Sequence, residues 1–322
     1  MRIVVTGALG YIGSRLVPAL RASFDDVDLV LIDNLSALPT CPLWALGTDR
    51  GIRFHETDVL TADLDELFDG ADAVIHLAAV ADAAGSFNNS GKIERINHAG
   101  TQRVAQACIR AGAALAFPST TSVYGTASGQ VAEDCDQAEL NPQSPYASIK
   151  LESERMLAAF EIDSGLRHVV FRFGTVFGPS PGMKFLTAVN KFCRQAVEGA
   201  PITVWRTAMD QRRPYLEIGD AVAALSFALR NDLFDGTVFN VVTVNTTVRR
   251  VLSHISAFLP NVDVRYVESP AMNALSFSVD SGRFGRAGFL PGGNLRDGIE
   301  ATIRSLQSRA VAAAPTPSVL PG

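Results

Sequence analysis

The feature that most limits the possible folds of this chain is a glycine-rich turn close to its start. The segment Thr6-Gly7-Ala8-Leu9-Gly10-Tyr11-Ile12-Gly13 stands between an expected strand and an expected helix. Gly7 permits a tight turn, Gly10 lets a diphosphate approach the backbone closely, and Gly13 permits close packing of the helix on the strand. The start of such a helix supplies N–H groups and a positive dipole. The turn therefore predicts a dinucleotide-binding fold, with cofactor contacts at Gly7, Gly10, Tyr11, Ile12 and Gly13.

The pattern of the first half agrees with that prediction. Short apolar or β-branched runs alternate with helical patterns, which is typical of a doubly wound α/β fold. The expected strands are Arg2–Thr6, Asp28–Ile32, Arg53–Thr57, Ala73–Leu77, Ala114–Ser119 and His168–Phe173. The expected helices include Gly13–Ser23, Ile96–Ala111 and Tyr146–Ser164. We therefore expect a Rossmann-type doubly wound parallel sheet.

The pattern becomes less regular after Gly178-Pro179-Ser180-Pro181-Gly182. Beyond it we expect helices at Phe185–Glu198 and Thr247–Phe258 and short strands near Ile202–Trp205 and Val238–Val242. Residues 1–178 are expected to form the dinucleotide-binding domain, which residues 214–242 rejoin. Residues 179–213 and 243–310 are expected to form a smaller α+β substrate-binding portion. The last residues, 311–322, are rich in alanine and proline and are expected to be a disordered tail.

Asp33 indicates which dinucleotide binds. It ends the second expected strand, twenty residues beyond Gly13. Its carboxylate can accept hydrogen bonds from both hydroxyls of the adenosine ribose and would repel a 2′-phosphate. The residues that follow, Asn34-Leu35-Ser36, include no arginine that could bind such a phosphate. NAD is therefore expected rather than NADP, with Asp33 and Asn34 beside it.

Further cofactor contacts are expected where the next strands end. Asp58-Val59 follows the third expected strand, beside the adenine, and Leu77-Ala78-Ala79 offers small residues and backbone against which a ligand could lie. Asn97 opens an expected helix and could contact the cofactor. The alternatives are a surface turn for Asp58 and a helix cap for Asn97. His76 is expected to be structural.

A tyrosine and a lysine stand four residues apart in Ser144-Pro145-Tyr146-Ala147-Ser148-Ile149-Lys150, which puts both side chains on one helical face. A free tyrosine titrates near pH ~10 and is a poor base at neutral pH. A lysine charge about 5 Å away, at an effective dielectric constant of about 20, would favour tyrosinate by ~3 kcal/mol and lower the pKa by about two units. The pair could therefore remove a proton from a hydroxyl, although this spacing also occurs by chance in many helices.

Taken in order, several segments resemble the motifs of the extended short-chain dehydrogenase/reductase family. They are the glycine-rich turn, Asp33-Asn34-Leu35-Ser36, His76-Leu77-Ala78-Ala79, Ser119-Thr120-Thr121-Ser122-Val123-Tyr124-Gly125 and Tyr146-x-x-x-Lys150. Within that family the chain most resembles the NAD-dependent sugar epimerase/dehydratase group, from Met1 to about Leu306. The resemblance implies a Rossmann domain and a second portion that covers a nucleotide-sugar substrate. It also implies a homodimer, formed through the helices expected at Ile96–Ala111 and Tyr146–Ser164.

The resemblance makes Thr120, Tyr146 and Lys150 the catalytic set. Tyr146 would exchange a proton with a substrate hydroxyl as hydride passes to the nicotinamide. Lys150 would hold the nicotinamide ribose and lower the pKa of Tyr146, helped by the positive charge of NAD⁺. Thr120 would hydrogen-bond the reacting oxygen, with Ser119 and Ser122 as alternatives. An ordinary strand residue or local cap is the competing interpretation of Thr120.

One departure from the family pattern bears on the reaction. The sugar 4,6-dehydratases of the family carry an Asp-Glu pair directly after the catalytic threonine, where this chain has Thr121 and Ser122. Without a carboxylic acid there, dehydration lacks its acid-base partner. We therefore expect an epimerase, which oxidises a sugar hydroxyl to a keto group and re-reduces it on the other face. Net oxidation, reduction or decarboxylation by the same family remains an alternative, as does a non-catalytic NAD-binding sensor.

On the substrate side, the resemblance places Phe173 near the nicotinamide. Thr175 stands where many nucleotide-sugar epimerases carry an asparagine that reaches the substrate. Arg213 resembles the family arginine that holds a diphosphate, a task suited to a guanidinium because it can donate two parallel hydrogen bonds. A solvated pair formed by Arg213 and Arg212 is the alternative. Further candidates for the substrate pocket are Thr120, Ser122, Tyr146 and Asn190.

The composition limits the partners. A chain of 322 residues with 47% hydrophobic residues can bury a large core, and a net charge of −5 argues against nucleic acid as the main partner. No apolar run approaches the ~18 residues that cross a membrane, and no secretory signal is expected before the first strand. The four cysteines (Cys41, Cys108, Cys135 and Cys193) are scattered, so neither a disulfide nor a metal site is expected. A cytoplasmic enzyme is therefore expected.

Overall fold

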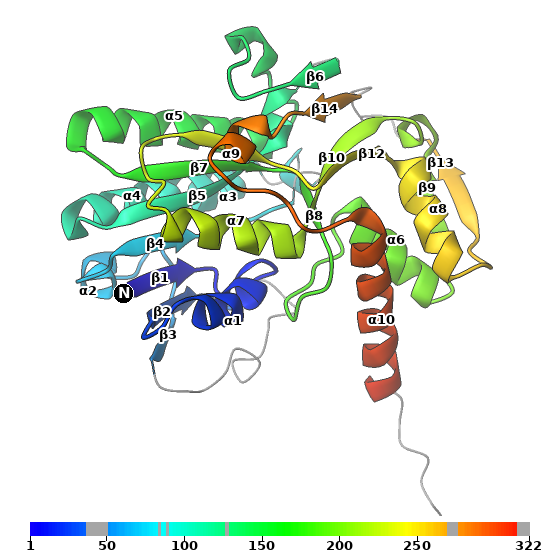
Figure 1. Cartoon of the computed structure of the whole chain (residues 1–322), viewed down its shortest axis with the longest axis horizontal. Coiled ribbons are helices and arrows are strands. Elements are labelled where there is room, and N and C mark those ends of the chain that lie inside the picture. Colours follow the sequence, from blue (N-terminus) through cyan, green and yellow to red (C-terminus); the bar gives the residue numbers. More distant parts are fainter. Residues whose placement is uncertain (37–50, 83–84, 88–89, 126–128, 269–275, 314–322) are drawn as a thin grey trace, which may run out of the picture.

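The computed structural model describes residues 1–36, 51–82, 85–87, 90–125, 129–268 and 276–313. Cys41 lies outside these residues. Figure 1 shows a large sheet with helices packed against it, and beside it a smaller group that contains α6, α8 and α10. The candidate site lies at the carboxyl ends of the strands of the large sheet.

Seven parallel strands form the large sheet in the order β11-β7-β5-β4-β1-β2-β3. Apolar side chains fill most of its strands, because helices cover both faces and leave no wet side. All six strands expected for the first half are present, and each end lies within one residue of its expected position. This order is that of a dinucleotide-binding sheet extended by a seventh strand, so the expected Rossmann-type fold is confirmed. The strands are β1 Arg2–Thr6, β2 Asp28–Asp33, β3 Ile52–Glu56, β4 Ala73–His76, β5 Ala114–Thr120, β7 His168–Phe173 and β11 Val238–Val241.

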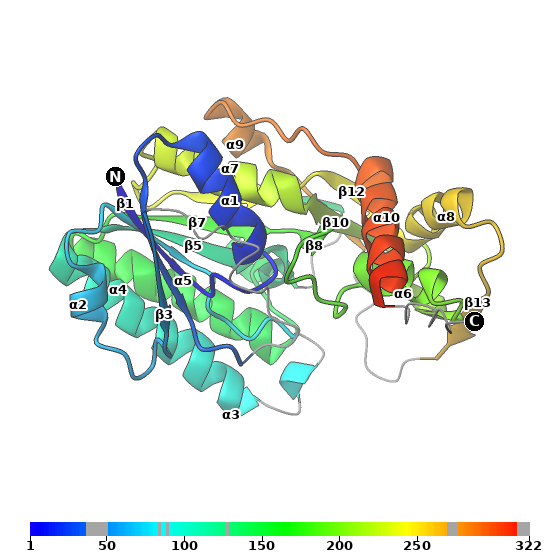
Figure 2. The ribbon, with the colours of Figure 1, turned by 90° about the horizontal axis from the view of Figure 1, so that it is seen from below.

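Two helical layers cover the sheet, as Figure 2 shows. The helices α1 (Gly13–Ser23) and α7 (Ile218–Arg230) pack on one face through Leu16, Leu20 and Leu225. The other face carries α2 (Leu64–Phe68), α4 (Gly100–Ala111) and α5 (Pro145–Ser164). The helix expected from Ile96 to Ala111 differs at its start, where α3 (Ser90–Ile93) runs through a π-helical turn, η3 (Glu94–Ala99), into α4. Such turns are rare and are frequently found at functional sites.

The smaller portion has a core of its own, formed by residues such as Val189, Phe192, Val251 and Ile299. It contains α6 (Ala188–Val197), α8 (Val248–Phe258) and α10 (Leu295–Ala313), and a two-stranded sheet of β9 (Ile202–Trp205) and β13 (Val264–Val267). A three-stranded sheet connects the two portions: β8 (Thr175–Phe177), β10 (Arg212–Glu217) and β12 (Val244–Thr247).

The remaining elements are short. They are η2 (Gly85–Phe87), η4 (Thr121–Tyr124), β6 (Gly129–Val131), η5 (Gln137–Glu139), η6 (Arg206–Ala208), β14 (Phe277–Val279) and α9 (Gly282–Arg286), with β6 paired to β14. Helix α10 continues to Ala313, so the first three residues of the predicted tail are helical. The rest of that tail, residues 314–322, lies outside the described residues. None of the helices that the structure describes is long and apolar enough to span a membrane.

Candidate active site

The glycine-rich turn brings β1, β4 and α1 closer together than any side chain would allow. Gly7 has a φ of +67°, and its N–H donates to the carbonyl oxygen of Ile32 at 2.7 Å. A Cβ on Gly7 would lie 2.7 Å from the backbone nitrogen of Ala78. A Cβ on Gly13 would lie 2.5 Å from the carbonyl oxygen of Gly7. The turn therefore sets the start of α1 directly beside the backbone that follows β4, a cradle that fits a diphosphate.

Asp33 is held beside this turn by backbone donors. Its Oδ2 accepts a hydrogen bond from the Leu9 N–H and its Oδ1 accepts one from the Leu35 N–H, both at 2.9 Å. Each carboxylate oxygen keeps a second lone pair for a ribose hydroxyl. Asn34 Nδ2 donates to Asp58 Oδ2 at 2.8 Å, so the predicted adenine-side residues of β2 and β3 lie together. Val59, which follows Asp58 in the chain, is buried.

The residues after β4 are held by four buried side chains, which we call the neutral network: Thr6, His76, Thr101 and Asn97. The amide of Asn97 accepts a hydrogen bond from the Val80 N–H at 2.8 Å and donates to the Val80 carbonyl at 3.0 Å. Thr101 donates to the carbonyl oxygen of Asn97 at 2.6 Å and lies 3.1 Å from His76 Nε2. Asn97 is thus neither a simple helix cap nor exposed: it anchors the backbone beyond Leu77, Ala78 and Ala79.

His76 completes the neutral network. Its Nδ1 lies 2.7 Å from Thr6 Oγ1, and Thr6 Oγ1 accepts a hydrogen bond from the Ala78 N–H at 3.2 Å. Because Thr101 already donates elsewhere, the pattern assigns the ring proton to Nε2. Burial lowers the pKa of His76 to about 3, so the ring is neutral at every physiological pH.

The three predicted catalytic residues lie on β5 and on the first turns of α5, which packs against β5 and η4. Ser144 caps α5 through a hydrogen bond from the Ala147 N–H at 3.2 Å, and Pro145 begins the helix. The Lys150 ammonium donates to the Pro118 carbonyl at 2.8 Å and lies 4.3 Å from the centre of the Phe117 ring. The chain therefore directs Lys150 at the end of the strand that carries Thr120.

The expected lowering of the tyrosine pKa is wrong for the chain by itself. Burial raises the pKa of Tyr146 to about 12 and lowers the pKa of Lys150 to about 8. Removing the phenolate from water disfavours the charged form, and the Lys150 ammonium donates to the Pro118 carbonyl rather than to the phenol. Lys150 is mainly an ammonium at pH 7, whereas Tyr146 is a phenol.

The hydroxyl groups around Thr120 have different surroundings. Thr120 Oγ1 accepts a hydrogen bond from the Ser122 N–H at 3.1 Å. Thr121 is buried and donates to the Phe173 carbonyl at 3.3 Å, whereas Ser122 is exposed. Ser119 donates to the buried carboxylate of Glu154. Of the two alternatives to Thr120, Ser119 therefore has its hydroxyl proton already committed.

Two predicted substrate residues lie in the connecting sheet. Thr175 is half-buried in β8, beside Tyr215 of β10. Arg213 is half-buried in β10, where its Nη2 donates to Gln211 Oε1 at 3.1 Å and its guanidinium lies 5.8 Å from the centre of the Phe277 ring. Burial lowers its pKa. Its surroundings differ from those of Arg212, which is exposed, so the two do not form a solvated pair.

Asn190 has a placement that does not favour the predicted substrate contact. The side chain is fully buried, its Oδ1 accepts from the Gly178 N–H at 3.1 Å, and its Nδ2 donates to the Tyr11 hydroxyl at 2.9 Å. The Tyr11 hydroxyl in turn donates to the Gly178 carbonyl at 2.8 Å, and burial raises its pKa. Asn190 and Tyr11 thus join the glycine-rich turn to the smaller portion.

Two groups of residues escaped the sequence reasoning. The first is the segment Ser180–Lys184, which covers the glycine-rich turn: Ser180 Oγ donates to the Tyr11 carbonyl at 2.7 Å, and the Gly182 N–H donates to Ser14 Oγ at 3.0 Å. Burial lowers the pKa of Lys184, and the charge of Asp33 opposes that shift. Nothing in the sequence marks this segment except one proline and one glycine, Pro181 and Gly182.

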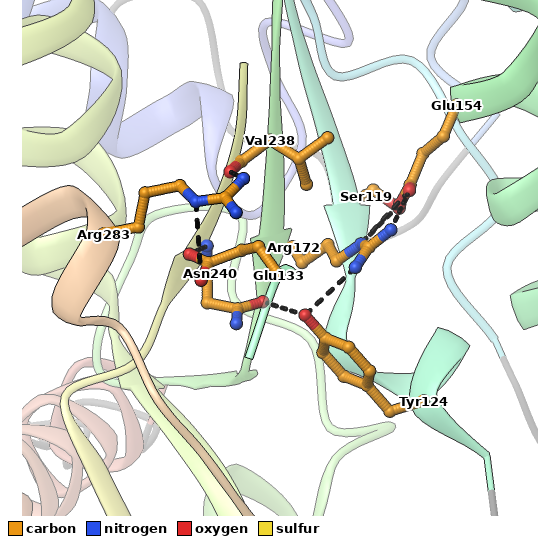
Figure 3. Close-up of polar contacts among 8 residues, drawn as sticks. All are labelled: Ser119, Tyr124, Glu133, Glu154, Arg172, Val238, Asn240 and Arg283. Carbon is orange, nitrogen blue, oxygen red and sulfur yellow. Dashed lines mark hydrogen bonds and ion pairs between the residues drawn. The ribbon is translucent and has the colours of Figure 1, made fainter. Parts of the chain in front are cut away.

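The second group surrounds the ion pair of Arg172 and Glu154, and several of its members are close in the chain to the predicted catalytic residues. We call it the charged network: Ser119, Tyr124, Glu133, Glu154, Arg172 and Asn240 (Figure 3). At its centre Arg172 of β7 and Glu154 of α5 form an ion pair at 2.7 Å. A sequence signal did exist, since Arg172 is a charge within an apolar strand. Among the described residues no cluster of His, Cys, Asp and Glu could hold a metal ion.

Residues 3–241 match a family model described as "NAD dependent epimerase/dehydratase family". An uncharacterized UDP-glucose epimerase of Bacillus subtilis is 30% identical over 249 residues, which are 75% of this chain and 76% of that protein.

Two solved structures extend the similarity over nearly the whole chain. The UDP-glucuronic acid 4-epimerase of Bacillus cereus, in complex with UDP-glucuronic acid and NAD, is 26% identical with a TM-score of 0.86, over 96% of this chain and 100% of that one. The dTDP-glucose 4,6-dehydratase DesIV of Streptomyces venezuelae, with NAD bound, is 25% identical with a TM-score of 0.87, over 97% and 98%. The similarity therefore includes both epimerases and dehydratases.

Proposed function

The chain belongs to the NAD dependent epimerase/dehydratase family, and from that membership we propose that it is an NAD-dependent epimerase of a nucleotide-activated sugar. The observation that carries the choice of epimerase is the composition of η4. Thr121 and Ser122 supply no carboxylic acid after Thr120, and the Thr121 hydroxyl is bonded to the Phe173 carbonyl. Glu154, a buried carboxylate bonded to Ser119 beside Thr120, is paired with Arg172 and cannot act as a general acid for dehydration.

The described residues fit NAD. The backbone of the glycine-rich turn would hold the diphosphate, Asp33 the adenosine ribose, and the Asn34–Asp58 pair with Val59 the adenine. Leu77, Ala78 and Ala79, fixed by the neutral network, would form the floor beneath the cofactor. Lys150 would bind the nicotinamide ribose, and Phe173 would lie beside the nicotinamide. When bound, NAD supplies the acceptor and then the donor of one hydride.

The catalytic set would move one proton in each half of the reaction. Tyr146 would take the proton of a sugar hydroxyl and return it after re-reduction, while Thr120 hydrogen-bonds the same oxygen. Because burial raises the pKa of Tyr146 to about 12 in the chain by itself, the positive charge of bound NAD⁺ would have to act together with Lys150 to lower it. Lys150 is suited to this, since its pKa of about 8 keeps it charged at pH 7.

Arg213 is the strongest candidate for the diphosphate of the sugar nucleotide. Its guanidinium is half-buried on β10, and a partly desolvated cation binds an anion more strongly than an exposed one. Thr175, Ser122, Thr120 and Tyr146 would line the sugar. Asn190 is left out of this set because its amide is bonded to Tyr11 and Gly178.

The test is to incubate the purified enzyme with UDP-, GDP- and dTDP-sugars without added NAD. An epimerase regenerates its cofactor in each cycle, so we expect an epimeric product with no net change in nicotinamide absorbance. Stoichiometric NADH, release of carbon dioxide or a 4-keto-6-deoxy product would replace the epimerase with another reaction of the family. NAD bound without hydride exchange on any sugar nucleotide would favour the sensor.

We also propose a homodimer, by analogy with the family, through α4 and α5. The molar mass measured by light scattering would distinguish a dimer from a monomer.

A further inference from the structure

The centre of the charged network joins three elements that each carry a candidate site residue (Figure 3). Arg172 donates to Glu154 through Nη2 at 2.7 Å and through Nε at 3.1 Å, and Ser119 donates to the other oxygen of the carboxylate. The exposed fractions of the Arg172 and Glu154 side chains are only 5% and 6%. Both charges are therefore satisfied by protein groups and shielded from water.

The network members are neighbours of the catalytic residues in the chain. Ser119 immediately precedes Thr120 on β5, and Arg172 immediately precedes Phe173 on β7. Glu154 lies one helical turn after Lys150 on α5, where residues four apart share a face. The ion pair therefore fixes the lateral position of α5 against the ends of β5 and β7.

The other end of Arg172 continues the connection. Its Nη1 donates to the Tyr124 hydroxyl at 3.0 Å, and that hydroxyl donates to Asn240 Oδ1 at 2.7 Å. The Asn240 N–H donates to Glu133 at 2.7 Å. The guanidinium is thus tied to η4, the short helix that follows Thr120, and to β11 beyond it.

Stability alone does not account for such a pair. A buried ion pair pays a large desolvation penalty, and apolar residues of similar size often stabilise a fold at least as well. The pair instead joins the three elements on which the candidate catalytic residues stand.

We propose that Glu154 and Arg172 are positioning residues that hold Lys150 and Thr120 in place and set the electric field at the lysine ammonium. This inference rests on the proposed function only in that Lys150 is taken to contact the cofactor.

The charged and titratable groups around Lys150 give the proposal a directional test. Glu154 and Tyr146 flank it on α5, His76 faces it from β4 as a neutral ring, and Arg172 stands beyond Glu154 on β7. The negative charge of Glu154 raises the pKa of Lys150 against the larger effect of burial. Removing Glu154 must therefore lower that pKa, and removing the charge of Arg172 raises it as long as Glu154 stays ionised.

The experiment measures the dissociation constant of NAD between pH 6 and 10 (about the range that brackets the lysine) by titration calorimetry, for the full chain and its variants. If binding needs the Lys150 ammonium, affinity falls on an alkaline limb. Glu154→Gln should move that limb down by about one pH unit, so that above it NAD binds about tenfold more weakly. Arg172→Met should move it up. Glu152→Gln, an exposed neighbour on α5, is the matched control and should leave the limb unchanged.

The outcomes separate this proposal from the proposed function. Shifts of opposite sign support positioning by charge, whereas a Glu154→Gln limb that coincides with the control, or that moves to higher pH, overturns it. If Arg172→Met does not fold by circular dichroism, Arg172→Lys replaces it and should keep the original limb because the charge remains. These readouts need no sugar substrate, so an enzyme that binds NAD with the expected shifts but epimerises nothing would refute the function and not the inference.

Discussion

The two networks behind the candidate site hold their elements by different means. The neutral network under the cofactor floor consists of two hydroxyls, an amide and an uncharged imidazole, all buried. The charged network behind the catalytic helix contains a buried ion pair. The neutral network fixes the backbone that follows β4, which is the proposed floor beneath the cofactor. Neutral groups can do this without burying a charge in the interior. Beside Lys150 the proposed role needs a field as well as a position, and charged groups supply a stronger field than neutral groups do.

The substitution with the largest expected effect should lower turnover and leave NAD binding nearly unchanged. Tyr146→Phe removes the proton-carrying oxygen and little volume, so turnover should fall by about 10³-fold, within the range typical of general acid-base catalysis. The NAD dissociation constant should change by less than about threefold, because Tyr146 does not build the glycine-rich cradle. Rates of epimer formation and calorimetric NAD titrations measure the two quantities. Near-normal turnover would remove Tyr146 from its role as general base.

The second largest effect is expected from a substitution in the glycine-rich turn on the cofactor side. Gly7→Ala combines a left-handed backbone with a Cβ that would lie 2.7 Å from the backbone of Ala78. We expect a loss of about 3 kcal/mol in the free energy of unfolding and weaker NAD binding. Gly112→Ala is the matched control, since Gly112 has a φ of +69° and open space around it. It should cost only the backbone strain, about 1 kcal/mol. Equal losses in urea unfolding would mean that the close approach at Gly7 is unimportant.

Whether the sequence alone predicts a feature of the two networks depends on how far apart the interacting residues lie along the chain. The strands, the helix α1 and the cradle follow from apolar periodicity and from glycines within eight residues, which are local properties. The charged network unites residues 119, 154, 172 and 240, which meet only once the sheet order is fixed. A charged residue within an apolar strand, Arg172, indicates a buried partner, but no local sequence pattern identifies Glu154 as that partner.

Two differences between the predictions and the structure have the same origin. The sequence placed a lysine charge near Tyr146 but could not measure how deeply the phenol is buried, and burial decides the direction of its pKa. The polar amide of Asn190 suggested a pocket, whereas the fold uses it to join Tyr11 to Gly178. Burial and long-range partners are properties of the assembled core.

A pH effect tests whether the neutral network is truly neutral. Burial holds the pKa of His76 at about 3 in the folded protein, against about 6.5 in the unfolded chain. Below pH ~6.5 the unfolded state therefore takes up a proton that the folded state does not bind. The contribution of His76 to the free energy of unfolding is fully present above that pH and is lost as the pH drops toward 3. Between pH 7 and 5 the loss from this one group is about 2 kcal/mol.

His76→Asn should abolish that part of the pH dependence, whatever it costs at pH 7. The measurement is urea unfolding at pH 7 and 5, with the difference between the two compared across variants. His55→Asn, on the half-buried face of β3, is the control. A pH dependence that is the same in all three proteins would show that His76 carries a proton in the folded state, which would make this network charged as well.

The smallest effect concerns the connection between the cofactor turn and the smaller portion. Tyr11→Phe deletes a hydroxyl that donates to the Gly178 carbonyl at 2.8 Å and accepts from Asn190 at 2.9 Å. Asn190 keeps its bond to the Lys184 carbonyl at 3.2 Å, so the loss should be about 1 kcal/mol in the free energy of unfolding. Tyr266→Phe, at a tyrosine that is 47% exposed, should cost almost nothing in the same free energy.

Because Tyr11 lies in neither network, its loss should leave the Tyr146-dependent turnover within about twofold. It should also speed the release of NAD, which stopped-flow fluorescence can follow. A fall in turnover as large as that of a catalytic variant would mean that the connection between the portions, and not the charged network, positions the catalytic residues.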